Sequence, residues 1–328
     1  SPVTDYWTVV ERFNTLELAG LRSGAQVFRA LERETKDRWQ GKAVGDITRQ
    51  DVRALIDDIK AGVGRTRGPA PVQAARVLSY LSWFYNWAVE NDIVTSNPAA
   101  RLPKPVNAFA RRRQRVLDDA ELVDLWRVAE RIGHPFGQMV QLLILTGCRL
   151  REVAEAEWSE FDLKAHRWLI PAARAKNGEA HEVHLTAPAL RILDTLPRIG
   201  EQPRFVLTTT GTSPISGFDR AKRKVDAMLA AIDAERLEAG EIGRPRDPWV
   251  FHDLRRSVAS GLARLKVPFE VLERVLAHRG ESASGLRAVY NRHTYEDEKA
   301  QALTKWAAHL EALTTDTGGN VVKFARGS

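Results

Sequence analysis

Hydrophobic residues recur at helical spacing over most of the chain, and the pattern is clearest between residues 72 and 91. Apolar positions there repeat every three or four residues, as on the buried face of an amphipathic helix. The residues that share this face are Ala75, Leu78, Leu81, Phe84, Tyr85 and Ala88. Similar spacing predicts helices over residues 27–39 and 52–59, and the Thr48 and Asp51 pair predicts the start of the latter.

A second helical region begins at residues 117–121, where three acidic residues favour a helix start because they face the positive end of the helix dipole. Helical spacing continues to Thr146 and breaks at Gly147. It resumes over residues 149–158, and residues 187–309 are again expected to be mainly helical.

Between these helical regions the spacing changes to that of strands. Residues 167–171 and 181–185 are short strand-like runs, and the Asn177-Gly178 pair between them indicates a hairpin. His181 and His184 are three residues apart on the second run, so their side chains point to opposite faces and do not form a metal-binding pair. The predicted fold class is mainly α with a small antiparallel β-sheet.

Prolines and positive charges mark a boundary between two domains. Two prolines stiffen residues 102–105, and four arginines keep residues 111–115 solvated. The expected divisions are a helical domain over residues 1–105, a basic linker over 106–115, a mixed α/β domain over 116–314 and a tail over 315–328.

Composition narrows the class of partner. The length of 328 residues suits two domains, and the net charge of +7 biases the chain toward a polyanion. Cys148 is the single cysteine, so a disulfide within the chain is impossible, which fits a reducing cytoplasm. The longest apolar run, residues 139–145, is too short to span a membrane. We therefore expect a cytoplasmic protein without a membrane partner.

The candidate chemistry begins with two positively charged positions. Arg149 and Glu152 are three residues apart and share a helix face, so the carboxylate can hold the guanidinium for bidentate phosphate binding. Lys176 lies at the tip of the expected hairpin, from which it can reach into a groove and donate a proton to a leaving alkoxide.

Further downstream, two imidazoles, another guanidinium and a phenol follow. His252 and Arg255 are three residues apart at an expected helix start, where free N–H groups favour anions. His278 follows an apolar run. Tyr290 supplies a phenol that can attack a phosphorus and leave a covalent ester, provided that nearby cations stabilise its ionised form. Tyr295 is the competing phenol.

Each of these motifs has an ordinary structural alternative when it is taken alone. Arg149 and Glu152 match a surface ion pair, and Lys176 matches a solubilising turn lysine. His252 matches a helix cap, His278 matches a core residue, and Tyr290 matches a buried aromatic residue. The occurrence of all of them in one chain, in an order that suits attack on a phosphodiester, favours the functional interpretation.

Together the motifs resemble those of the tyrosine recombinases, also called the phage integrase family. Residues 290–306 are most similar to integrases of prophages and genomic islands. The resemblance implies a helical core-binding domain and a mixed α/β catalytic domain. The matching segments are Thr146–Glu152 for the first-arginine box, Lys176 for the lysine between two strands, His252–Arg255 for the H-x-x-R box, Leu276–His278 for the Leu-Gly-His box (with Ala277 in place of glycine) and Val289–Tyr290 for the nucleophile.

The resemblance also implies a mechanism for DNA integration and excision. Tyr290 would attack a DNA phosphate, form a 3′-phosphotyrosyl bond and release a 5′-hydroxyl. Lys176 would protonate the leaving oxygen, and the reaction would need no metal or nucleotide cofactor. The implied catalytic residues are Arg149, Lys176, His252, Arg255, His278 and Tyr290, with Glu152 in support.

The implied partners are double-stranded DNA attachment sites, further copies of the chain in a tetramer, and DNA-bending accessory proteins. An amphipathic segment at residues 304–314 either packs on its own domain or, with the tail to residue 328, docks on a neighbouring protomer. The candidate DNA-binding residues are Arg65, Arg67, Arg76, Arg111, Arg112 and Arg113.

Two other functions share some of these features. A type IB topoisomerase-like nicking-closing enzyme uses the same chemistry without synapsis, and it would relax supercoils without a defined site. A DNA-binding regulator with an inactive site is the second alternative, and the presence of all the expected residue types argues against it.

Overall fold

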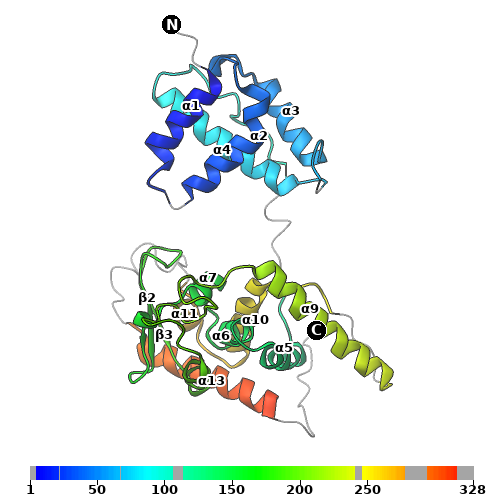
Figure 1. The fold of residues 1–328 in the computed structure, drawn as a ribbon, viewed down its shortest axis with the longest axis vertical. Coiled ribbons are helices and arrows are strands. Elements are labelled where there is room, and N and C mark those ends of the chain that lie inside the picture. Colours follow the sequence, from blue (N-terminus) through cyan, green and yellow to red (C-terminus); the bar gives the residue numbers. More distant parts are fainter. Residues whose placement is uncertain are drawn as a thin grey trace. The chain divides into compact units, whose positions relative to one another are not determined.

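The computed structural model describes residues 5–21, 23–66, 68–105, 114–240, 246–277 and 294–315. The chain divides into two compact units, Ser1–Arg113 and Gln114–Ser328 (Figure 1). Each unit has its own hydrophobic core. Within the described residues both units are mainly helical, and the second contains a three-stranded antiparallel sheet. The predicted fold class is therefore confirmed.

Aromatic residues fill the core of the first unit. The ring of Tyr6 lies edge-on to Trp39, with 5.1 Å between centroids, and to Phe84, with 5.6 Å; such arrangements place the positive ring edge on a negative face. The Tyr6 hydroxyl donates a hydrogen bond to Thr35 Oγ1 at 3.0 Å, which satisfies it inside the core. The elements of this unit are α1 (Tyr6–Phe13), a π-helical turn (Asn14–Leu18), α2 (Gly24–Trp39), a 3-10 turn (Val44–Asp46), α3 (Arg49–Ala61) and α4 (Pro71–Glu90).

The helices of the first unit begin and end close to where the sequence predicts. Thr48 caps α3, and the Asp51 carboxylate accepts the Thr48 backbone N–H in return. The buried face of α4 includes five of the six predicted residues, whereas Ala75 is only half-buried. Ala74 is buried in its place. The stripe that contains Ala74 continues through Val77 and Leu81 at helical spacing, so the prediction placed the edge of the stripe one residue too far along the chain.

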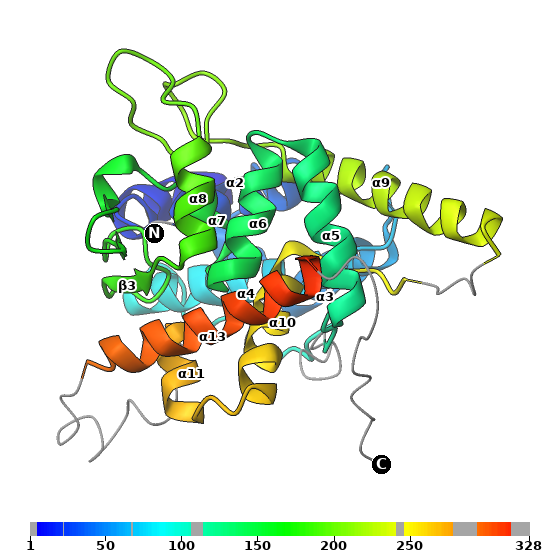
Figure 2. The same cartoon turned by 90° about the horizontal axis from the view of Figure 1, so that it is seen from below.

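The second unit is organised around α6 (Phe136–Thr146), which is apolar on all sides and almost entirely buried. A helix with this composition must be surrounded by other elements. Helices α5, α8, α10 and α13 pack against it, and Figure 2 shows α13 beside α5 and α6. The other helices of this unit are α5 (Asp119–Ile132), α7 (Leu150–Ala154), α8 (Ala187–Thr195), α9 (Phe218–Glu238), α10 (Phe251–Arg264), α11 (Phe269–Val275) and α13 (Glu296–Thr315).

The predicted hairpin is present in the second unit. Strands β2 (Arg167–Ile170) and β3 (His181–His184) pair antiparallel, with Trp168 opposite Val183. A third strand, β1 (Phe161–Asp162), pairs with β2. It is too short to show an alternating pattern, and the sequence did not predict it.

Two helical predictions for the second unit were too broad. The helix expected over residues 149–158 ends at Ala154, because the backbone beyond it pairs with another segment: the Trp158 N–H donates to Arg204 O at 2.9 Å. No helix forms over residues 196–217, all of which the structure describes. This segment contains three prolines and three glycines, which break helices.

The C-terminal amphipathic segment lies in α13 and packs on its own unit. Trp306 is fully buried, and its indole N–H donates to Ile144 O at 2.8 Å. The rest of the predicted self-association segment, residues 316–328, lies outside the described residues. Among the residues that the structure describes, no helix is both long and apolar enough to cross a bilayer.

The contact between α10 and α13 depends on Gly261. A Cβ atom at this position would lie 2.2 Å from Cζ3 of Trp306. We expect Gly261→Ala to lower the free energy of unfolding by about 1–3 kcal/mol, because the indole ring must move within a packed core. Urea unfolding followed by circular dichroism measures the change. Ser260→Ala, on the same helix, is the control, and equal stability of the two variants would contradict this packing.

Candidate active site

The end of α6 creates the backbone geometry from which the site is built. Gly147 ends the helix in a left-handed conformation with φ of 64°. A Cβ atom here would lie 3.0 Å from side-chain atoms of both Val258 and Leu276. Glycine is therefore required twice over, by backbone conformation and by the close approach of the neighbouring segments. The turn brings Arg149 to the first position before α7.

Arg149 and Glu152 form a pair that is held from two sides. The Glu152 carboxylate accepts the Arg149 backbone N–H at 2.8 Å and its Nη1 at 2.7 Å. Only 5% of the Glu152 side chain is exposed, against 20% for Arg149. The pair is therefore not an exposed surface ion pair. The carboxylate fixes the guanidinium while part of it stays accessible.

Arg255 lies on α10 and is 96% buried, with 4% exposed. Its Nη1 donates to Gly147 O at 2.7 Å, and its Nη2 donates to Leu276 O. Burial, followed by the neighbouring charge of Arg149, lowers the pKa of Arg255 to about 10, so the group remains charged at neutral pH. These contacts bring the two predicted arginines to one place.

Burial favours the neutral form of Glu152, but the hydrogen bonds from Arg149 and the charges of Arg149 and Arg255 together outweigh it. The pKa of Glu152 therefore lies below its ordinary value of 4.5. The Glu152 carboxylate thus faces the guanidiniums of Arg149 and Arg255. These three side chains form a centre that carries a net positive charge at neutral pH.

The segment before His278 is held by both arginines. Ala277 O accepts Arg149 Nη2 at 3.3 Å, and the preceding residue, Leu276, accepts from Arg255. Ala277 has φ of 46°, in the region that favours glycine, which explains why glycine is usual at this position of the matching motif. His278 and Tyr290 themselves lie outside the described residues.

His252 and Lys176 are both exposed, and the positive charge of Lys176 acts on His252. His252 is in the first turn of α10, as predicted. Burial of part of the ring, followed by the charges of Arg256 and Arg255, lowers the pKa of His252, and Lys176 contributes in the same direction. The imidazole is therefore neutral at neutral pH and can accept a hydrogen bond. Lys176 lies in the β2–β3 loop, as predicted.

The sequence did not single out His181 as a site residue. His181 is buried on β3, whereas His184 is only partly buried, in agreement with their predicted opposite faces. Burial, followed by the charge of Lys299, lowers the pKa of His181 to about 4, and both Arg149 and Arg255 contribute. Among the described residues, its Nε2 has no hydrogen-bond partner. Nothing in the alternation of a short strand distinguishes such a residue from an ordinary core residue.

Two more side chains in the region have structural explanations. Cys148, the residue before Arg149, is buried. Burial together with the charge of Glu152 raises the pKa of its thiol to about 12. It therefore stays a thiol at neutral pH and packs as a small apolar group. Arg151 is 71% exposed and pairs with Glu155, away from the centre.

The predicted DNA-binding arginines fall into three groups. Arg76 is exposed on α4. Arg65 donates to both carboxylate oxygens of Glu34, at 2.8 and 2.9 Å, so its charge is already compensated within the first unit. The others, Arg67, Arg111, Arg112 and Arg113, lie outside the described residues.

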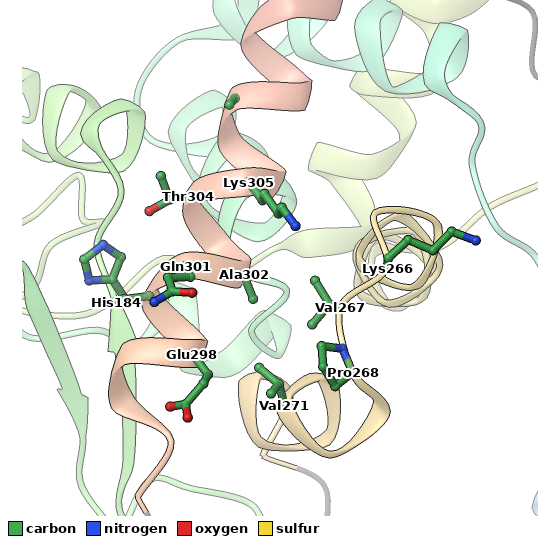
Figure 3. A pocket seen from close by; sticks show the side chains of 12 residues that line it. His184, Lys266, Val267, Pro268, Val271, Glu298, Gln301, Ala302, Thr304 and Lys305 are labelled. Atoms are coloured by element: carbon green, nitrogen blue, oxygen red, sulfur yellow. The ribbon is translucent and has the colours of Figure 1, made fainter.

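A cavity of about 760 Å³ lies elsewhere in the second unit (Figure 3). Val267, Pro268, Val271 and Ala302 form apolar parts of its wall, next to α13. Of the predicted catalytic residues that the structure describes, which are Arg149, Lys176, His252 and Arg255, none lines it. Within the ranges that the structure describes, no three His, Cys, Asp or Glu side chains are grouped as metal ligands would be. Paired guanidiniums such as those of Arg149 and Arg255 have the geometry to bind a tetrahedral anion.

Residues 115–297 match the model of the phage integrase family. The chain is 26% identical over 307 residues to prophage integrase IntA of Escherichia coli (strain K12), and the match covers 90% of this chain and 66% of that protein. The chain thus spans slightly less than two thirds of the length of this relative.

Solved structures with a similar fold include two forms of lambda integrase. A fragment of it, crystallised as a dimer on a COC′ core site, matches with a TM-score of 0.61 and 19% identity, over 86% of this chain and 98% of that one. A lambda integrase tetramer bound to a Holliday junction matches with a TM-score of 0.60 and 19% identity, over 86% and 80%. At this identity the likeness establishes the fold.

The Glu152–Arg149 pair predicts a pH-dependent contribution to stability. Because the pKa of Glu152 is lowered in the folded chain, its stabilising effect is fully present above its ordinary value of 4.5 and is lost as the pH falls through the folded value. We expect Glu152→Gln to reduce the free energy of unfolding by about 1–3 kcal/mol at neutral pH, and the difference from the parent to shrink in acid.

Urea unfolding at a series of pH values measures this difference. The matched control is Glu155→Gln, because Glu155 pairs with the exposed Arg151 and should contribute at most about 1 kcal/mol. A difference for Glu152→Gln that stays constant from neutral to acidic pH would contradict the charged pair.

Proposed function

Because the chain belongs to the phage integrase family, we propose that it is a site-specific DNA recombinase that cuts and rejoins DNA through a 3′-phosphotyrosyl intermediate. The observation that supports this function best is the convergence of Arg149 and Arg255 on one turn, with Glu152 behind them. Two fixed guanidiniums at one place suit the two non-bridging oxygens of a phosphodiester.

In the first step of the proposed reaction, the Tyr290 oxygen forms a bond to the scissile phosphorus and the bond from phosphorus to the 5′-oxygen breaks. Negative charge builds on the non-bridging oxygens, where Arg149 and Arg255 lie ready to stabilise it. Arg149 is held by Glu152 before DNA binds, whereas Arg255, which donates to two backbone carbonyls, must direct a further N–H to the phosphate.

Proton transfers complete the step. As it attacks, Tyr290 passes its proton to a neighbouring imidazole, that of His252 or His278, and the leaving 5′-oxygen gains one from Lys176. His252 is neutral and exposed, so it suits a hydrogen bond to the phosphate or transient acceptance of a proton. His278 has the parallel role. The 5′-hydroxyl of a second strand then attacks the phosphotyrosine, which restores the phosphodiester and the tyrosine.

The contacts of Tyr295 support Tyr290 as the nucleophile. The Tyr295 hydroxyl donates to Glu270 Oε2 at 3.5 Å, and the Arg274 guanidinium lies 4.6 Å from the centre of its ring. The phenol is thereby directed toward α11. Its position agrees with a structural role.

The proposed partners follow from the function. Lambda integrase has been crystallised on a core site as a dimer and on a Holliday junction as a tetramer. We infer that this chain likewise acts on double-stranded DNA attachment sites as a tetramer, with DNA-bending accessory proteins, at the bacterial nucleoid. We propose that the basic linker, residues 106–115, contacts DNA phosphates.

The nucleophile is tested with a nicked suicide DNA substrate that traps the covalent intermediate. We expect Tyr290→Phe to abolish the covalent adduct, because the ring then lacks the attacking oxygen. Tyr295→Phe is the matched control and should retain the adduct. An adduct that persists in Tyr290→Phe and disappears in Tyr295→Phe would reverse the assignment.

The linker is tested by the salt dependence of DNA binding. Replacement of Arg111, Arg112 and Arg113 by Ala should reduce the slope of log K against log salt by about 0.9 for each phosphate contact that is removed. Arg204→Ala, an exposed arginine of the second unit, serves as the control. An unchanged slope in the triple variant would exclude the linker from the phosphate contacts.

A further inference from the structure

Arg174 connects three elements around the proposed centre. Its Nε and Nη2 donate to the two carboxylate oxygens of Glu160, each at 2.6 Å. The same guanidinium donates to Glu152 O at 3.2 Å and to Arg151 O at 3.4 Å. Only 16% of the Arg174 side chain and 7% of the Glu160 side chain are exposed. This is a largely buried bidentate pair, which holds its geometry far better than a surface ion pair does.

Glu160 is fixed from a second direction. Its Oε2 also accepts the indole N–H of Trp168 at 2.9 Å, and Trp168 is buried on β2. The carboxylate therefore ties β2 to the start of the loop that leads to β3. Arg174 lies in this loop, two residues before Lys176.

The contacts of Arg174 with α7 satisfy a general need of helices. The last carbonyls of a helix have no partner within it, and a cation at this end also interacts favourably with the helix dipole. In α7 the Arg174 guanidinium donates to Glu152 O and lies at the negative end of the helix. Arg151 O already accepts the Glu155 N–H at 3.0 Å, and Arg174 adds a second, longer hydrogen bond to it. The same five-residue helix carries Arg149 just before its first residue.

Backbone hydrogen bonds fix the segment between Arg174 and Lys176, so the position of Arg174 determines that of Lys176. Ala175 is buried, and its N–H donates to Pro171 O at 3.0 Å. The Gly178 N–H then donates to Ala175 O at 3.2 Å, in a turn that Gly178 permits with φ of 72°. Lys176 thus projects from a short segment that is held on both sides.

We propose that Arg174 is a positioning residue that fixes the Lys176 loop to the helix that carries Arg149. The proposal rests on the proposed function, in which Lys176 protonates the leaving 5′-oxygen. The distance between the proton donor and the phosphate site is then set by one guanidinium that holds the loop to α7 directly and to β2 through Glu160. Lysine could not replace it, because a single ammonium group lacks the planar fork that contacts Glu160 twice and two carbonyls at once.

The test compares two DNA substrates in single-turnover cleavage. One has the natural 5′-oxygen at the scissile phosphate, and the other has sulfur in its place. A thiol has a pKa of about 8.5, far below that of a hydroxyl, so the sulfur leaves without a proton donor. A variant that has lost only the protonation step is therefore slow on the oxygen substrate and restored on the sulfur substrate.

We expect Lys176→Ala to cleave the oxygen substrate about 100-fold or more slowly and to be restored by sulfur. Arg174→Ala and Arg174→Lys should show the same pattern with a loss of about 10- to 100-fold in the cleavage rate. A displaced Lys176 transfers its proton to the leaving oxygen less efficiently. Glu160→Gln, which removes the charge but keeps the shape, should follow Arg174→Ala in the same direction. Arg204→Ala, which breaks an exposed Arg–Glu pair in the same unit, should cleave both substrates like the parent.

The outcomes separate this proposal from the proposed function. If sulfur fails to restore Lys176→Ala, the role of Lys176 as the acid is wrong and the proposal falls with it. If sulfur restores Lys176→Ala but neither Arg174→Ala nor Glu160→Gln, the pair has only a structural role and the proposal alone is overturned. Full activity of both pair variants on the oxygen substrate would overturn it as well.

Discussion

The buried charge of Arg255 is the constraint on which the rest of the second unit depends. A charge in a protein interior is strongly unfavourable unless hydrogen bonds and an opposite charge compensate it. The carbonyls of Gly147 and Leu276 accept its hydrogen bonds, and Glu152 supplies a negative charge nearby. Glu152 also forms an ion pair with Arg149, so this centre of two guanidiniums and one carboxylate keeps an excess of positive charge. In the proposed function the scissile phosphate provides the missing negative charge, and binding relieves the repulsion between the two guanidiniums.

The path of the chain follows from this requirement. Gly147 must turn sharply so that its carbonyl faces Arg255, and the turn starts α7 with Arg149 at its head. The short helix is then held at its far end by Arg174, which belongs to the loop between two strands. A helix of five residues is not stable alone, since most of its stability comes from the groups around it. The contacts that give α7 its shape are therefore the same ones that place the proposed acid and the guanidinium that we propose binds phosphate.

The sequence predicted the local features of this arrangement and missed those that depend on distant partners. The cap at Thr48, the break at Gly147 and the strands around Lys176 are encoded by residues close together in the chain, and all three are present. The pairing of Arg149 with Glu152 could be predicted for the same reason. The end of α7 could not, because it is set by pairing with residues about 50 positions later. Nor could Arg174, whose partners lie on other elements, or His181, whose burial reflects tertiary packing.

A crystal structure of the Tyr290→Phe variant, bound to the DNA with which the parent chain forms its covalent adduct, tests the central claim most directly. We predict that Arg149 and Arg255 each donate to a non-bridging oxygen of one phosphate at about 3 Å, while Arg149 keeps its contact with Glu152. A scissile phosphate bound away from these two guanidiniums, or in contact with Arg149 alone while Arg255 remains committed to the backbone, would contradict it.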